Sequence, residues 1–317
     1  MYQDMYERWL AADLDDPDLK PELESIRGDD AAIQDRFAVA LKFGTAGLRG
    51  VIGAGTNRMN IYVVRQATQG LANWVKTQGG SQTVAISYDS RIKSDLFAKT
   101  AAQVLAANGI HVRIYRALMP VPALSFATRY YKCNAGIMVT ASHNPAKYNG
   151  YKAYGPDGCQ MTDEAADVVY AEIQKTDVLT GARIMPFAEG MEKGLIEYVG
   201  DDCINALYEA IEARSIRPGI CKTAGLKLVY SPLNGSGLVP VTHVPVSYTH
   251  LHARCPAAIP GGRHLPVRQE HRGPGTADPL QCRPAAGQPV AAAHCGGRGG
   301  RRGGPSGQRP GLRPASV

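Results

Sequence analysis

Strand-like and helix-like segments alternate along residues 60–214 of this 317-residue chain. Apolar residues at helical spacing predict helices over 60–79, 94–108, 122–131, 162–173 and 201–214. Apolar runs predict strands over 83–88, 111–115 and 135–140. Helices of this length between strands imply βαβ crossovers, in which helices bury a parallel sheet on both faces. We therefore expect an α/β fold: a three-layer α/β/α domain with a mainly parallel sheet.

Polar residues at the predicted helix starts support this pattern. Asn60 and Ser94 are predicted N-caps, and Thr162 begins a later helix. Nearer the N-terminus, Asp4 and Glu7 resemble a capping box that opens a short helix, with two more helical stretches before residue 42.

The expected organisation has four segments. They are a helical extension over 1–42, the α/β domain over 43–215, the beginning of a second α/β domain over 216–246 and a tail over 247–317. The second domain is expected because Leu226–Leu233 reads as a new first strand that runs into a turn at Asn234–Gly237.

The tail differs in composition from the rest of the chain. It holds 13 Gly, 10 Pro, 10 Arg and 10 Ala, and its only acids are Glu270 and Asp278. Its charge is therefore +8, so residues 1–246 carry the remaining −1 of the total of +7. Such a segment cannot bury enough apolar surface to offset its ordering entropy, and we expect it to be disordered.

Two origins of the tail follow from its composition. Ala, Gly, Pro and Arg have GC-rich codons, so we expect residues 247–317 to be a frameshift or assembly product of a GC-rich gene. Nucleic-acid binding by an Arg/Gly-rich segment is the alternative. It is disfavoured because Tyr248 is the single aromatic residue of the segment.

Several classes of protein are excluded. No apolar run approaches the ~18–20 residues that cross a bilayer. The N-terminus is mixed in charge and lacks the apolar segment of a signal peptide. The seven cysteines form no C-x-x-C pair, which argues against a zinc site or a disulfide framework. We expect a cytoplasmic protein, with no membrane or nucleic-acid partner.

A glycine-rich loop precedes the alternating segments. Five of the thirteen residues 43–55 are glycine, and Arg49 lies among them. Such a loop can offer backbone N–H groups and a guanidinium to a phosphate. A dinucleotide site is the alternative, but Gly53-Ala54-Gly55 lacks the third glycine of that fingerprint and no strand is predicted directly before it.

A second loop follows the predicted strand 135–140, at the end where open α/β sheets bind ligands. It offers a hydroxyl, an imidazole and an amine from Ser142, His143 and Lys152. Asn-Pro and Asn-Gly pairs also suit an ordinary turn. A Ser–His–Asp hydrolase is disfavoured, because neighbouring side chains of an extended chain point to opposite faces and no G-x-S-x-G surrounds Ser142.

Four stretches together resemble the α-D-phosphohexomutase superfamily over about residues 1–245, nearest its phosphoglucomutase/phosphopentomutase branch. They are Phe43–Gly50, Tyr88–Arg91, Gly136–Pro145 and Gly150–Lys152. The resemblance implies that Ser142 carries a phosphoryl group. It also implies interconversion of hexose 1-phosphate and hexose 6-phosphate through a bisphosphorylated sugar, with Mg²⁺ bound and glucose 1,6-bisphosphate as activator.

The resemblance also implies a role for each site residue. Arg49 would lie beside the phosphoserine, and Lys152 would serve proton transfer or charge stabilisation. His143 would support the nucleophile, and Thr45 would help to hold phosphate. For Asp89 and Arg91 two readings stay open, a position near the loop and a buried ion pair that shapes the domain.

The sequence departs from the family pattern after the first domain. The family has four domains, and its second-domain D-x-D-x-D-R loop, which holds Mg²⁺, does not occur here. Ser142, through its phosphate, is therefore the one metal contact expected. A catalytically inactive fragment is the alternative function. Specificity for mannose or pentose phosphate also stays open, because the family reads the sugar with its third domain, and so does the oligomeric state.

Overall fold

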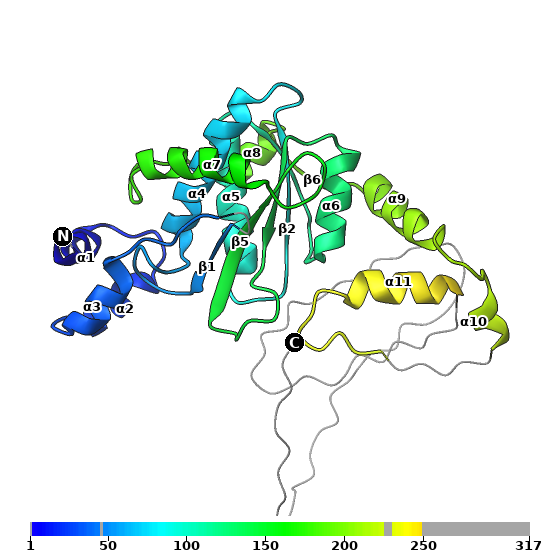
Figure 1. The fold of residues 1–317 in the computed structure, drawn as a ribbon, viewed down its shortest axis with the longest axis horizontal. Helices are drawn as coiled ribbons and strands as arrows, with labels where there is room; N and C mark the ends of the chain where they lie inside the picture. The colour runs from blue at the N-terminus through cyan, green and yellow to red at the C-terminus, as the bar shows by residue number, and fades with distance from the viewer. Residues whose placement is uncertain (1, 45–46, 225–229, 249–317) are drawn as a thin grey trace, which may run out of the picture. The chain divides into compact units, whose positions relative to one another are not determined.

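A six-stranded mixed sheet forms the centre of the fold in the computed structural model, which describes residues 2–44, 47–224 and 230–248 (Figure 1). The strand order is β1-β5-β4-β2-β3-β6. The strands are β1 (Leu48–Val51), β2 (Thr83–Tyr88), β3 (His111–Ile114), β4 (Ala135–Val139), β5 (Tyr148–Tyr154) and β6 (Ile196–Tyr198). Strands β4, β2, β3 and β6 are parallel, whereas β5 and β1 are antiparallel to their neighbours. The prediction of a mainly parallel sheet is confirmed.

Helices cover both faces of this sheet (Figure 1). One face carries α4 (Ile61–Thr77), α5 (Ser94–Ala107), α7 (Asp163–Lys175) and α8 (Phe187–Glu192), and the other carries α6 (Val121–Tyr130) and α9 (Asp201–Glu212). Side chains alternate along the strands, so Ile137 joins the core under α4 and α5, and Met138 joins the core under α6. The three-layer α/β/α architecture is confirmed.

Three helices precede the sheet, as predicted: α1 (Tyr2–Ala11), α2 (Leu19–Ser25) and α3 (Asp30–Phe37). Trp9 of α1 is fully buried and makes edge-to-face contacts with Phe37 and Tyr62, which ties the extension to α4. The predicted capping box is wrong. The helix begins at Tyr2, so Asp4 lies inside its first turn, where a carboxylate suits the positive end of the helix dipole.

The other predicted caps differ in outcome. Asn60 caps α4, accepting hydrogen bonds from the backbone of Tyr62 and Val63 at 3.1 and 3.0 Å, and Thr162 caps α7. Ser94 does not cap α5. It is the first residue of that helix, and its hydroxyl donates instead to Asp89 at 2.8 Å.

Two segments predicted as loops contain strands. Residues 48–51 of the glycine-rich loop form β1, and residues 148–154 form β5, with Leu48 opposite Tyr151. Gly150 permits this pairing, because a Cβ there would lie 2.6 Å from the Thr140 carbonyl oxygen and 2.9 Å from that of Leu48. Strand β1 also ends two residues before Gly53, where no strand was expected. Asn and Gly in β5 hide its strand character from propensity.

Beyond α9 the described chain contains α10 (Ile220–Thr223) and α11 (Leu238–Tyr248). Residues 230–233, the described half of the strand predicted over 226–233, are not in a strand. The expected turn at Asn234–Gly237 does lead into a helix, α11, which packs beside α9. The predicted tail, apart from its first residues in α11, lies outside the described residues. Among those described, no helix is long and apolar enough to cross a membrane.

Candidate active site

Ser142 stands three residues beyond the carboxyl end of β4, on a segment that we call the serine loop (residues 140–148). It is exposed, and its φ of +56° places it in the left-handed region, which non-glycine residues seldom occupy. Such strain is typical of positions where the surrounding structure fixes a functional side chain. The fold therefore presents this hydroxyl at the edge of the sheet where α/β proteins bind ligands.

His143 follows directly and lies beside the serine hydroxyl. The distance between Ser142 Oγ and His143 Nδ1 is 3.4 Å. The expectation that these neighbours point to opposite faces is wrong, because Ser142 is left-handed rather than extended. In the described part of the chain no carboxylate is hydrogen-bonded to His143, so the pair lacks the third member of a hydrolase triad.

Asp89, at the end of β2, holds the start of the serine loop. One of its oxygens accepts a hydrogen bond from the Thr140 hydroxyl at 2.5 Å, and that hydroxyl oxygen in turn accepts from the Ser142 backbone N–H at 2.9 Å. The other accepts from the Arg91 backbone N–H at 3.0 Å and from the Ser94 hydroxyl. Arg91 also forms an ion pair with Asp89 at 3.6 Å. Both readings left open by the sequence hold: the ion pair exists, and it lies against the loop.

Arg49 reaches the serine loop from β1. It is exposed, it pairs across the strands with Gly150, and its guanidinium donates a hydrogen bond to the Asn144 side-chain oxygen at 3.2 Å. A cation thus stands beside the loop that bears Ser142.

Lys152 is half-buried on β5, opposite Met138 of β4. Residues two apart on a strand share a face, so Lys152 lies on the face that carries Gly150 and its partner Arg49. The glycine-rich loop closes directly over this strand, because a Cβ on Gly47 would lie 2.9 Å from the Lys152 Cα. The fold thus places Ser142, His143 and Arg49 at the serine loop, and Lys152 on the same face of the neighbouring strand β5. Thr45 lies outside the described residues.

Metal-binding groups are scarce in the described residues. No group of three or more His, Cys, Asp or Glu side chains lies close enough together there to hold a metal ion. Asp89, the nearest carboxylate described at the serine loop, is already bonded to Thr140, Ser94 and Arg91. These residues alone therefore do not fit a complete Mg²⁺ site, which needs about six oxygen ligands.

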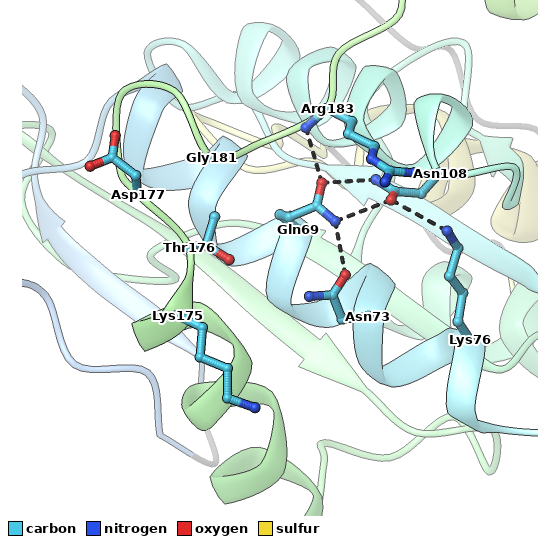
Figure 2. A pocket seen from close by; sticks show the side chains of 9 residues that line it. All are labelled: Gln69, Asn73, Lys76, Asn108, Lys175, Thr176, Asp177, Gly181 and Arg183. Carbon is cyan, nitrogen blue, oxygen red and sulfur yellow. Dashed lines mark hydrogen bonds between the residues drawn. The ribbon is translucent and has the colours of Figure 1, made fainter.

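A second hollow, which we call the amide pocket, has a volume of about 470 Å³ and lies among α4, the end of α5 and the segment after α7 (Figure 2). Buried Gln69 and Asn108 exchange hydrogen bonds at 2.9 and 3.1 Å, and Gln69 also donates to Asn73. None of the predicted site residues lines it. In the sequence, the polar residues Gln69 and Asn73 among the apolar residues of the helix predicted over 60–79 are the feature that could have indicated this pocket. The hydrogen bonds between Gln69 and Asn108 link α4 to the end of α5.

Comparisons of the sequence and of the fold with known proteins indicate the family of this chain. The family described as phosphoglucomutase/phosphomannomutase, alpha/beta/alpha domain I, matches residues 40–179. A phosphoglucomutase of Staphylococcus haemolyticus is 37% identical over 219 residues, which cover 68% of this chain and 38% of that protein. A phosphoglucomutase of Staphylococcus saprophyticus is 33% identical, over 66% of this chain and 37% of its own length. The chain thus spans well under half the length of these relatives.

Among solved structures, pp63/parafusin, a phosphoglucomutase from Paramecium in its open form, superposes with a TM-score of 0.52 at 16% identity. The superposition covers 66% of this chain and 42% of that one, and shows a shared fold. The chain therefore belongs to the α-D-phosphohexomutase superfamily, with a phosphoglucomutase/phosphomannomutase domain I in residues 40–179.

Proposed function

We propose that this chain is the phosphoserine-bearing part of a phosphoglucomutase-type enzyme, which interconverts hexose 1-phosphate and hexose 6-phosphate. The observation that carries the proposal is Ser142, held at a positive φ beyond the end of β4 with Arg49 bonded to the same loop. Membership of a phosphotransferase family supplies the reaction class.

The proposed step moves one phosphoryl group. Phosphorylated Ser142 gives its group to the sugar monophosphate: a P–O bond forms to the free sugar hydroxyl as the bond between phosphorus and Ser142 Oγ breaks, and the proton of the sugar hydroxyl passes to Ser142 Oγ. After the resulting bisphosphorylated sugar has turned over, its other phosphoryl group returns to Ser142 Oγ, and the proton passes back to the departing sugar oxygen. Phosphoryl transfer depends on in-line positioning and on positive charge around the transferring oxygens. Arg49 and Lys152 would supply that charge.

His143 and Thr45 take supporting roles in this proposal. The imidazole Nδ1, 3.4 Å from Ser142 Oγ, would steady the hydroxyl or its ester. Thr45, in the glycine-rich loop, would add a hydroxyl to the phosphate contacts.

Mg²⁺ and glucose 1,6-bisphosphate are the proposed cofactors. The bisphosphate would load Ser142 and is also the reaction's intermediate. A magnesium ion would neutralise phosphate charge on Ser142 and would take its remaining ligands from outside the described residues.

Glucose phosphate is the proposed substrate because the curated relatives bear the name phosphoglucomutase. Mannose and pentose phosphates are the alternatives. A parallel assay with glucose, mannose and ribose 1-phosphates distinguishes them, and a higher kcat/KM for either alternative would replace glucose.

A second candidate is a fragment that is phosphorylated but does not turn over substrate. The matched part covers 38% and 37% of the relatives' own lengths, and these small shares favour the second candidate.

One experiment tests both candidates. The purified chain is incubated with glucose 1,6-bisphosphate and Mg²⁺, and intact-mass and peptide mass spectrometry locate any phosphoryl group. Conversion of glucose 1-phosphate is followed in parallel, with Ser142→Ala as control. Phosphorylation at Ser142 with turnover supports the enzyme, and phosphorylation without turnover supports the fragment. Wild-type chain that never carries phosphate on Ser142 contradicts both.

A further inference from the structure

We infer that Arg91 is the positioning residue of the serine loop, and that its guanidinium fixes the main chain that presents the Ser142 hydroxyl. The inference rests on the proposed function for what that hydroxyl does. The hold on the loop is a property of the fold and can be measured separately.

Four main-chain carbonyls of the serine loop accept hydrogen bonds from this one guanidinium. Nη2 donates to the carbonyl oxygens of Ser142 and Asn144 at 2.5 and 2.6 Å. Nη1 donates to those of Pro145 and Tyr148 at 3.2 and 3.0 Å. The loop wraps around a planar cation, and the fork geometry of arginine suits several acceptors at once in a way that lysine does not.

Asp89 fixes the orientation of that guanidinium. The carboxylate lies 3.6 Å from Arg91 Nε, and the Arg91 side chain is 12% exposed. The same carboxylate accepts the Thr140 hydroxyl, which accepts the Ser142 N–H. Ser142 is therefore held on both sides, at its N–H through Thr140 and at its carbonyl through Arg91. Two neighbouring parallel strands, β2 and β4, bring these groups together.

Arg49 and Arg91 have different roles at the serine loop. Arg49 is exposed and makes a single side-chain contact to the loop, so its charge is available to a phosphate. Both Nη groups of Arg91 donate to main-chain carbonyls, and its Nε faces the Asp89 carboxylate. Arg91 thus acts through the backbone. Without it, the loop would lose the contacts that oppose relaxation of Ser142 from its strained conformation.

Arg91→Lys tests the inference, with Arg58→Lys as matched control. Arg58 is also buried and also donates to main-chain carbonyls, those of Asp35 and Asn57, away from the serine loop. We expect amide hydrogen exchange within residues 142–148 to be about tenfold faster in Arg91→Lys than in wild type. Exchange in β2 and β4 should stay as in wild type, and Arg58→Lys should leave the loop protected.

The second readout is the rate at which glucose 1,6-bisphosphate phosphorylates Ser142. A displaced nucleophile slows the chemical step, so we expect the maximal rate to fall about 100-fold in Arg91→Lys. The concentration of bisphosphate that gives half that rate should stay nearly unchanged, because Arg91 does not bind the donor. A purely structural defect would instead lower the folded fraction, and a defect in phosphate binding would raise that concentration.

The outcomes separate the two proposals. The positioning role would be overturned if amide exchange in the serine loop of Arg91→Lys were as slow as in wild type, or if the maximal rate of Ser142 phosphorylation were unchanged. Wild type that never becomes phosphorylated would overturn the proposed function, and the exchange data would then decide on Arg91 alone. If Arg91→Lys does not fold, Arg91→Gln, which keeps the Asp89–Thr140–Ser142 contacts and removes the guanidinium, is measured against the same expectations.

Discussion

At the scale of single residues, the backbone conformation of Ser142 is energetically unfavourable, and neighbouring hydrogen bonds maintain it. A φ of +56° costs a non-glycine residue about 1–2 kcal/mol. Hydrogen bonds at its N–H and at its carbonyl keep the residue there. The backbone strain therefore lies at the residue whose hydroxyl the proposed chemistry uses.

Ser142→Gly should consequently be more stable than Ser142→Ala. Both variants lose the hydroxyl, but glycine adopts a positive φ without steric cost, whereas alanine keeps the Cβ that causes the strain. We expect a difference of about 1 kcal/mol in the free energy of unfolding, measured by urea denaturation of the two variants. Equal stabilities, or a more stable alanine variant, would show that the loop is not strained at this residue.

Cysteine reactivity offers another test at this scale. Burial raises the pKa of Cys133 to about 12 and that of Cys203 to about 11, whereas Cys159 is exposed. Only a thiolate is alkylated rapidly. A short pulse of iodoacetamide at pH 8 should therefore modify Cys159 and spare Cys133 and Cys203 in native protein, as mapped by peptide mass spectrometry. Unfolding in urea should make all three react, which serves as the control.

At the scale of elements, the antiparallel strands β1 and β5 add residues of the candidate site to the edge of the parallel part of the sheet. Strand β5 returns along β4 from the serine loop, and β1 pairs beside β5. Arg49 of β1 and Lys152 of β5 therefore lie on strands next to the corner where β4 ends. Glycines make the approach close enough. A Cβ on Gly47 would lie 1.9 Å from the carbonyl oxygen of Tyr151.

Gly47→Ala and Gly44→Ala form a matched pair that tests this approach. Gly47 has a φ of +77° and no room for a methyl group, whereas a Cβ on Gly44 would meet nothing within 4 Å. We expect Gly47→Ala to lower the free energy of unfolding by at least about 2 kcal/mol and Gly44→Ala to change it by less than about 0.5 kcal/mol. Chemical denaturation measures both, and equal effects would show that the loop does not pack on β5 as described.

At the scale of the whole molecule, the helical extension is attached to the α/β domain by packing and by charge. Trp9 packs against Tyr62 of α4, and Arg8 forms two hydrogen bonds with Asp177, at 2.7 and 2.8 Å, just after α7. The hydrogen bonds from Arg8 hold the pKa of Asp177 well below its ordinary value.

That shift predicts a pH dependence. The folded-state pKa of Asp177 lies below its unfolded value of about 3.9, so its stabilising contribution is present above that pH and is lost as the pH falls through the folded value. Both partners are partly exposed, so the contribution is at most about 1 kcal/mol. Asp177→Asn should be less stable than wild type by up to that amount at pH 7, and the gap should begin to narrow below pH ~4.

Glu209→Gln is the control for this experiment, because Glu209 is exposed on α9 and forms no ion pair among the described contacts. Its stability should follow that of wild type at every pH, measured by denaturation from pH 3 to 7. A gap between Asp177→Asn and wild type that is unchanged at pH 3 would contradict the assignment to this ion pair.

Local patterns predicted most of the architecture and the corner where the site lies. An apolar run located β2, helical spacing of apolar residues located α4, and Asn60 was recognisable as a cap from its type and place. Strands β1 and β5 were missed because their glycines and polar residues form strands only through pairing with each other and with β4. The role of Arg91 was also not predictable in detail, since it depends on which carbonyls the folded loop turns inward.

The sheet ends on two of its shortest strands, β1 with four residues and β6 with three. Short edge strands offer few free backbone groups to a foreign strand, and a charged side chain on the edge discourages edge-to-edge aggregation further. On β1 that charge is Arg49, which the proposed chemistry also uses to hold phosphate. Selection for phosphate binding and selection against self-association would therefore act on the same guanidinium, and its loss would expose the protein to both failures at once.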